Sequence, residues 1–110
     1  MNKLTDLEIC KRIAEIEKLP HHLEEGMNDK FINTSTIYGD VCEYNPLTDD
    51  ALIFNLAFTH KVKIDYFDEC VYLANPRTLA SYRFNKNEIA SLRKAICLAI
   101  IETHKELNNG

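Results

Sequence analysis

The apolar residues near the start of the chain follow the spacing of an amphipathic helix. Thr5 and Glu8, three residues apart, form the pattern of a capping box, and we predict that Pro20 ends the helix. Between them, apolar side chains recur on one helical face at Ile9, Ile13 and Ile16. The exposed face carries charges at Glu8, Lys11, Arg12, Glu15 and Lys18. We therefore predict one buried stripe and one solvated side for this helix.

Residues 20–45 carry weaker signals, because their β-prone runs are short and turn residues interrupt them. Candidate strands lie at Phe31–Thr34 and Ile37–Tyr44, with Gly39-Asp40 among the interruptions. We predict a β-hairpin in this region.

A second helix is predicted to follow the segment Asn45-Pro46-Leu47. Thr48 is the predicted N-cap, and Asp49 and Asp50 place negative charge at the positive end of the helix dipole. The predicted buried stripe is Leu52, Ile53, Leu56 and Ala57, with Phe54 and Phe58 at its edge.

Three strand-like runs come next. Apolar and charged residues alternate from Val62 to Tyr66, which indicates a half-exposed strand. Cys70–Ala74 is the second run, and Leu79–Phe84 is the third. In the third run we expect Ala80, Tyr82 and Phe84 on the buried face, and Leu79, Ser81 and Arg83 on the other.

A long helix closes the chain, capped by Asn85 or Asn87. One predicted face consists of Ile89, Leu92, Ile96, Ala99 and Ile100. The segment Ala95–Ile101 is apolar nearly all round, so we expect it to be buried on more than one side, against a sheet and against a helix or a second subunit. The element order is α-β(β)-α-β-β-β-α. This order predicts an α+β fold, with a mainly antiparallel sheet flanked by three helices.

The composition favours one folded domain over residues 1–110. Of these residues, 45% are hydrophobic and 27% are charged, which is too apolar for a disordered chain. No apolar run reaches the roughly 18 residues of a membrane span, and we expect a soluble intracellular protein. The net charge of −4 disfavours nucleic-acid binding, which needs a broad basic field. Within the chain, however, residues 1–60 carry −6 and residues 61–94 carry +3.

Neither a metal site nor a cofactor is indicated by the cysteines and histidines. Cys10, Cys42, Cys70 and Cys97 stand about thirty residues apart, without any Cys-x-x-Cys pair. Reduced structural thiols are the simplest interpretation, and disulfides or a site assembled in space are the alternatives. His21 and His22, His60 and His104 lack metal-ligand spacing. A chain with three glycines and no Gly-x-Ser-x-Gly motif also offers no catalytic signature, so we expect a nonenzymatic protein.

Three segments resemble the small bacteriophage proteins called phage ABA-sandwich or NinX-like. They are LEICKRIA (residues 7–14), YNPLTDDA (44–51) and RKAICLAIIE (93–102), in that order. The resemblance implies a helix–sheet–helix sandwich encoded by a phage or prophage, in the cytoplasm of an infected bacterium. It implies no catalytic residues. Accessory phage genes often act against host defences, which makes anti-defence activity an expectation by association.

Two groups of residues are candidates for binding a small ligand. Around the start of the second helix, Tyr44 and Asn45 border exposed helix amides, although a purely structural role explains most of this motif. In the basic region, Arg77, Arg83 and Lys86 suit phosphate groups, and Tyr82 could stack on a base. The alternative for this second group is an ordinary solvated strand face with aromatic residues in the core.

These features lead to three functional hypotheses. The first is an inhibitor of a host antiviral defence protein, with the acidic residues Glu24, Glu25 and Asp29 contacting a basic surface of the partner. The second is a sponge that sequesters a small anionic nucleotide signal at Arg77, Arg83 and Lys86. The third is a structural or regulatory phage protein without a ligand, which forms a homo-oligomer through its last helix.

Overall fold

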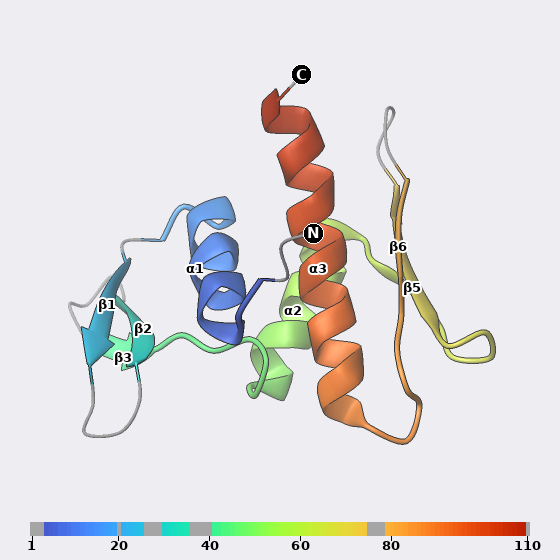
Figure 1. The fold of residues 1–110 in the computed structure, drawn as a ribbon, viewed down its shortest axis with the longest axis horizontal. Coiled ribbons are helices and arrows are strands. Elements are labelled where there is room, and N and C mark those ends of the chain that lie inside the picture. Colours follow the sequence, from blue (N-terminus) through green and yellow to red (C-terminus); the bar gives the residue numbers. More distant parts are fainter. Residues whose placement is uncertain (1–3, 20, 26–29, 36–40, 75–78, 110) are drawn as a thin grey trace. The chain divides into compact units, whose positions relative to one another are not determined.

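A computed structural model of the chain shows two compact units, Met1–Asn45 and Pro46–Gly110 (Figure 1). The structure describes residues 4–19, 21–25, 30–35, 41–74 and 79–109, with side chains in 4–19, 43–73 and 80–104. The described residues form three helices and two antiparallel three-stranded sheets. The fold is α+β, as expected, but the strands form two separate sheets where one sheet flanked by three helices was predicted. The prediction of a single domain stays a prediction.

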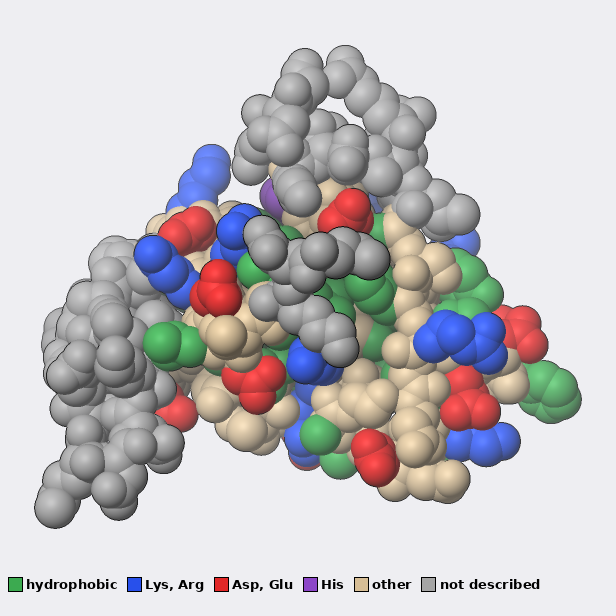
Figure 2. Space-filling model, in the orientation of Figure 1, with side chains coloured by type: hydrophobic (Ala, Val, Ile, Leu, Met, Phe, Trp, Pro, Cys, Tyr) green, Lys and Arg blue, Asp and Glu red, His purple; other side chains and the backbone are tan. Residues whose placement is uncertain are grey.

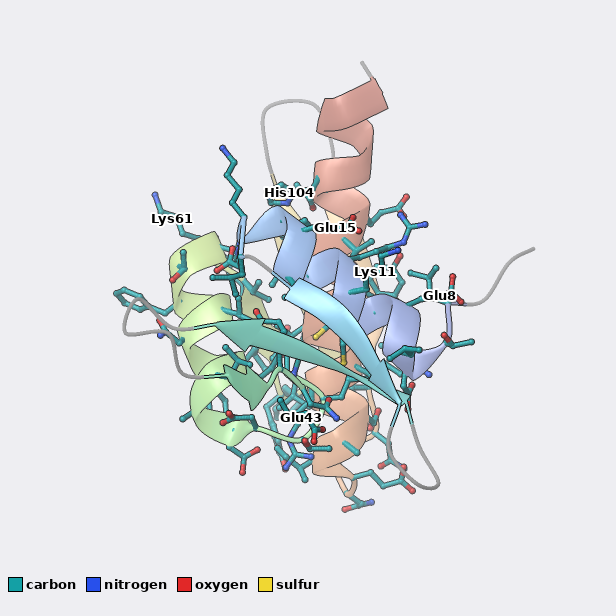
Figure 3. All side chains as sticks on the ribbon, turned by 90° about the vertical axis from the view of Figure 1, so that its left-hand side faces the viewer. Glu8, Lys11, Glu15, Glu43, Lys61 and His104 are labelled. Carbon is teal, nitrogen blue, oxygen red and sulfur yellow. The ribbon has the colours of Figure 1, made fainter. Side chains whose placement is uncertain are left out.

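Helix α1 (Asp6–Ile16) begins with the predicted capping box. The Thr5 hydroxyl accepts from the Glu8 amide at 3.2 Å, and the Glu8 carboxylate accepts from the Thr5 amide at 3.1 Å. Ile9 and Ile13 are fully buried. Glu8, Lys11 and Glu15, labelled in Figure 3, are exposed side chains along the predicted charged face.

The end of α1 is set before Pro20. Lys18 takes a left-handed conformation (φ 57°), and the Leu19 amide donates to the Ala14 carbonyl at 3.0 Å. This is a Schellman motif, in which the residue after the helix reverses the chain and satisfies the last carbonyls. The helix therefore ends at Ile16 through this C-cap, before it reaches Pro20, the residue predicted to end it.

The first unit also contains a sheet of strand order β1-β2-β3. Strand β2 (Lys30–Ser35) pairs with β3 (Val41–Glu43), which confirms the predicted pairing; residues 37–40 of the predicted strand 37–44 lie outside the described residues. Strand β1 (His21–Glu25) was not predicted. It pairs antiparallel with β2, with His21 opposite Thr34 and Glu25 opposite Lys30.

The second unit opens with α2 (Asp50–His60). Its N-cap is Asp49, whose carboxylate accepts from the Leu52 amide at 3.1 Å, so the predicted cap at Thr48 is wrong by one residue. Ile53, Leu56 and Ala57 are buried, Leu52 is half-buried, and Phe54 and Phe58 are exposed. At the far end, Lys61 is left-handed (φ 60°), and the Val62 amide donates to the Ala57 carbonyl at 2.9 Å.

A second sheet follows, with strand order β4-β5-β6. Its strands are β4 (Lys63–Asp65), β5 (Cys70–Ala74) and β6 (Leu79–Arg83), all antiparallel and close to the predicted runs. On β6 and just beyond it, Ala80 and Phe84 are buried and Ser81 and Arg83 are exposed, which confirms the predicted faces.

Helix α3 (Ile89–Asn109) packs against α2 and against β5 and β6 (Figure 1). Ile96, Cys97, Ala99 and Ile100 are completely buried, which confirms burial of the apolar segment on more than one side. The expectation for Ile89 is wrong, because it lies in the first turn and is 50% exposed. The predicted caps Asn85 and Asn87 are wrong, because the helix begins at Ile89 and the Asn85 side chain accepts from the Asn87 amide at 2.9 Å in the turn before it. No helix in the described part of the chain is both long and apolar enough to cross a membrane.

Candidate functional site: the β4–β5 hairpin

The turn between β4 and β5 is held by side-chain contacts of its acidic residues. Asp65 pairs with Cys70 across the strands, and its carboxylate accepts from the Asp68 amide at 3.0 Å. Glu69 is left-handed (φ 53°), and its carbonyl accepts from the Phe84 amide at 2.9 Å. These acidic residues therefore organise the turn.

The segment after β6 is tied to this turn. The Tyr66 hydroxyl donates to the Lys86 carbonyl at 3.1 Å, and the Lys86 amide donates to the Glu69 carboxylate at 3.2 Å. The rings of Tyr66 and Phe84 lie 6.1 Å apart, tilted by 51°. The hairpin and the residues before α3 thus form one surface with defined side-chain positions.

That surface is hollowed, with a volume of about 680 Å³. We name it the hairpin surface, and its lining residues are Lys63, Ile64, Asp65, Tyr66, Phe67, Tyr72 and Lys86. Three of its large side chains are exposed: Ile64 is 38% exposed, Tyr66 59% and Phe67 96%. In Figure 2, hydrophobic side chains lie among charged ones over this end of the sheet. Exposed apolar groups gathered in this way are typical of an interaction site.

The acidic and basic side chains of the hairpin surface differ in their contacts within the chain. The Asp65 and Glu69 carboxylates accept backbone hydrogen bonds, as described above. Lys63 and Lys86 have exposed side chains without an ion-pair partner among the residues whose side chains are described. The hollow is therefore lined by two positive charges and by the negative charge of Asp65, beside aromatic rings.

Tyr72 adds a neutral hydroxyl to this surface. Its oxygen lies 3.1 Å from the Cys70 sulfur. The hydrogen bond with Cys70, together with desolvation and the negative charges of Asp65 and Asp68, raises the pKa of Tyr72 to about 12. The phenol is uncharged at neutral pH, and its raised pKa reflects in part the negative charges of Asp65 and Asp68 beside the hollow.

The residues predicted to bind a phosphate and a base are only partly brought together. Lys86 lines the hollow, and Arg83 is exposed beside Cys70 on the sheet. Tyr82, the neighbour of Arg83, is half-buried on the opposite sheet face, where burial and the Glu102 carboxylate on α3 raise its pKa. Tyr82 therefore does not share a face with Arg83. Arg77 lies outside the described residues.

Tyr44 and Asn45 belong to the first unit and have structural contacts there. Tyr44 is 6% exposed. The Asn45 side chain accepts from the Cys10 thiol at 3.4 Å and donates to the Glu43 carboxylate at 3.5 Å (Glu43 is labelled in Figure 3). These contacts favour the structural interpretation of the motif that Tyr44 and Asn45 begin.

The predicted partner-binding residues belong to the first unit. Glu24 and Glu25 lie on β1, where the side chains are outside the described set, and Asp29 lies outside the described residues. Their contact with a partner stays a prediction.

Arg93 links two of the segments that carry the family resemblance. Its Nε lies 2.7 Å from an Asp50 carboxylate oxygen, and its Nη1 donates to the Leu47 carbonyl at 3.3 Å. Arg93 on α3 therefore holds the first turn of α2, and this basic residue of region 61–94 has a structural partner.

The described thiols and imidazoles have local structural contacts. Cys10, Cys70 and Cys97 are buried thiols. His60 and His104 pack edge to face, with ring centroids 5.2 Å apart. Among the described residues, no three His, Cys, Asp or Glu side chains are placed to share a metal ion.

Sequence analysis missed Lys63, Ile64, Tyr66 and Phe67 as functional candidates. A signal was present, because Tyr66 and Phe67 stand in a turn, where polar residues are usual. Comparisons with protein-family models, with curated proteins and with solved structures found no match for this chain.

Proposed function

We propose that this chain is a nonenzymatic phage accessory protein that binds and inhibits a protein of the host's antiviral defence. The hairpin surface is its contact site. The observation that carries this proposal is the exposure of Ile64, Tyr66 and Phe67 around one hollow. Aromatic side chains of this kind dominate the binding energy of protein interfaces.

The energetic argument rests on Phe67. A side chain that is 96% exposed contributes almost nothing to the packing of its own chain. Burying a phenylalanine side chain is worth roughly 1.5–3 kcal/mol, which a partner that covers it would gain. Tyr66 is held by its hydrogen bond to Lys86, so less side-chain freedom is lost when it is covered.

The phage setting and the sandwich architecture are proposed from the resemblance. Support comes from Arg93, which connects YNPLTDDA with RKAICLAIIE through Asp50 and Leu47. The two segments therefore contact each other in the folded second unit. The packing of α3 on β5 and β6 provides one helix–sheet layer of the proposed helix–sheet–helix sandwich.

The nucleotide-sponge alternative is less well supported. It places a base on Tyr82 next to phosphates on Arg83, and these two side chains occupy opposite faces of the sheet. Lys63 and Lys86 line the hairpin surface together with Asp65, whose negative charge also disfavours an anion there.

An infection assay tests the proposed function. The chain is expressed in bacterial strains that each carry one antiviral defence system, and phage plating is compared with and without it. We expect the wild type to restore plating on at least one defended strain, and Phe67→Ala to lose this effect. Phe58→Ala is the matched control, because Phe58 is 85% exposed on α2 and lies outside the hairpin surface.

The outcomes separate the parts of the proposal. A wild type that restores plating on no strain contradicts the anti-defence function. If Phe67→Ala is as active as the wild type at equal expression, the hairpin surface is not the contact site.

A further inference from the structure

Strand β4 lies at the edge of its sheet. The strand order is β4-β5-β6, and among the described strands only β5 pairs with β4. An edge strand presents a row of backbone amides and carbonyls that can pair with another strand. Residues of an antiparallel strand alternate in the side to which they direct these groups. The ladder of this sheet therefore identifies the residue of β4 whose backbone groups lie at the edge.

That residue is Ile64. The Glu69 carbonyl accepts from the Phe84 amide and so points toward β6. The carbonyl and amide of one trans peptide point in opposite directions, so the amide of the next residue, Cys70, points toward β4, where it faces Asp65. Asp65 therefore belongs to a hydrogen-bonded pair with β5. Its neighbour Ile64 directs its amide and carbonyl to the outer edge of the sheet.

The run Val62–Tyr66 is complementary to a second copy of itself. An antiparallel pairing with its two-fold axis at Ile64 places this residue opposite the second copy's Ile64. Lys63 then lies opposite the second copy's Asp65, and Val62 lies opposite the second copy's Tyr66. Because side chains alternate along a strand, the apolar pairs share one face of the sheet and the opposite charges share the other. The charged pairs also occupy the positions without backbone hydrogen bonds, where side chains come closest.

The two charges of β4 also select this register. An axis at Lys63 would place two lysines opposite each other, and an axis at Asp65 would oppose two aspartates; like charges directly opposite are destabilising. Lys63 is exposed and has no ion-pair partner among the residues whose side chains are described. The Asp65 carboxylate accepts from the Asp68 amide and keeps its negative charge. Both charges are therefore present for pairs between two copies.

The apolar side of the same register covers exposed surface. Ile64 is 38% exposed and Tyr66 is 59% exposed. The hydrogen bond from Tyr66 to the Lys86 carbonyl holds its side chain, so less side-chain freedom is lost when a second copy covers it. Backbone groups, apolar side chains and charges at this edge thus all match one occupant.

We propose that the chain forms a homodimer in which β4 pairs antiparallel with β4 of a second copy, centred on Ile64. The two β4-β5-β6 sheets then become one continuous sheet. This inference goes beyond the proposed function and does not rest on it, because the paired run ends at Tyr66 and Phe67 lies outside it. It also places self-association at an edge strand instead of at the last helix, whose segment from Ile96 to Ile100 is largely buried within one copy.

Sedimentation equilibrium of the full chain at neutral pH tests the inference. We expect the wild type to form dimers with a dissociation constant below about 1 mM. Lys63→Asp should raise this constant roughly 10-fold or more, because both charged pairs of the dimer then oppose two carboxylates. Lys11→Asp is the matched control, since it reverses an exposed positive charge on α1 and should leave the constant unchanged.

Mixing two variants tests the register. Asp65→Lys alone should also weaken the dimer, because two lysines then oppose each other. A mixture of Lys63→Asp with Asp65→Lys should form mixed dimers, in which opposite charges face each other again. Circular dichroism spectra check that each variant is folded, since Asp65 also holds the turn through the Asp68 amide.

Cross-linking provides a second test that leaves Asp65 in place. Hydrogen-bonded antiparallel pairs have Cα atoms about 5.5 Å apart, within the range that a disulfide spans. Mild oxidation should therefore link two copies of Ile64→Cys. Phe58→Cys, at a position that is 85% exposed on α2, is the control and should link much more slowly. The wild type controls for the native cysteines.

The remaining outcomes overturn the inference. A wild type that stays monomeric at about 1 mM contradicts the dimer, and a dimer that Lys63→Asp does not weaken has its contact elsewhere. Folded variants that form no mixed dimer, or an Ile64→Cys that links no faster than Phe58→Cys, contradict the register. The infection assay is independent: a monomeric wild type that restores plating removes this inference and keeps the proposed function, and a dimer that restores none does the reverse.

Discussion

The contact between Arg93 and Asp50 provides the sharpest test of how the second unit is held together. We consider Arg93→Gln and Asp50→Asn, which remove the charges and keep similar side-chain sizes. Arg93 is 15% exposed and Asp50 is 60% exposed, so the pair is only partly shielded from water. Fully exposed pairs contribute about 0.2–1 kcal/mol, whereas hydrogen bonds to charged groups contribute about 1.5–3 kcal/mol.

These values bracket the expected effect. We expect Arg93→Gln to lower the free energy of unfolding by about 1–2 kcal/mol, because it loses the ion pair and also the bond to the Leu47 carbonyl. Asp50→Asn should cost less. The coupling energy between the two substitutions should be about 0.5–1 kcal/mol at low salt, and it should shrink at 1 M salt.

Urea unfolding followed by far-ultraviolet circular dichroism measures these energies, since the chain contains no tryptophan for fluorescence. All four members of the double-mutant cycle are compared at one temperature. Arg12→Gln serves as a control for an exposed arginine and should change stability by less than about 0.5 kcal/mol. A coupling energy within error of zero would refute the assignment of Arg93 as a structural link.

Three further predictions concern local features. Thr5→Ala should lower stability by about 1 kcal/mol. The bonds from the Thr5 amide and hydroxyl lower the pKa of Glu8 below 4.5, so their contribution to stability is present above pH 4.5 and is lost as pH falls through the lowered value. Acid melts of Thr5→Ala should show a smaller loss, because the hydroxyl bond is removed and the amide bond remains. Lys61→Gly should stabilise the protein by about 0.5–1 kcal/mol in thermal melts, because glycine relieves the left-handed strain that Lys61→Ala retains. Tyr72→Phe should remove the ultraviolet tyrosine transition near pH 12; the stabilisation linked to this pKa is present below pH 10 and is lost as pH rises toward 12. If the transition lost in Tyr72→Phe lies near pH 10, the ordinary tyrosine value, the Cys70 hydrogen bond is contradicted.

Local sequence signals were sufficient to predict most of the helices and strands. The Thr5–Glu8 capping box, the strand Cys70–Ala74 and the apolar segment of α3 were all found from residues that are neighbours in sequence. Such signals act over a few residues, through caps and through the helix and strand periods, so they need no knowledge of the rest of the fold.

Strand β1 and the exact start of α2 were not predicted correctly from the sequence. Strand β1 has the sequence His-His-Leu-Glu-Glu, which lacks an apolar alternation, and its structure comes from pairing with β2. Thr48 and Asp49 are both suitable caps, but Arg93, 43 residues beyond Asp50, binds that first residue of α2. The sequence offers both residues as caps, and the structure uses Asp49, whose carboxylate accepts from the Leu52 amide.

The candidate site depended most on tertiary structure. Alternation from Val62 to Tyr66 was enough to predict a strand, yet the exposure of Ile64 and Tyr66 follows from which strands α3 packs upon, namely β5 and β6. Because side chains alternate along a strand, the sequence alone places Tyr82 and Arg83 on opposite faces of the sheet. The contact between Lys86 and Tyr66, by contrast, forms only because the chain reverses through β5 and β6. A binding surface is assembled from side chains of separate elements, and their convergence is a property of packing, because local spacing does not specify how the elements meet.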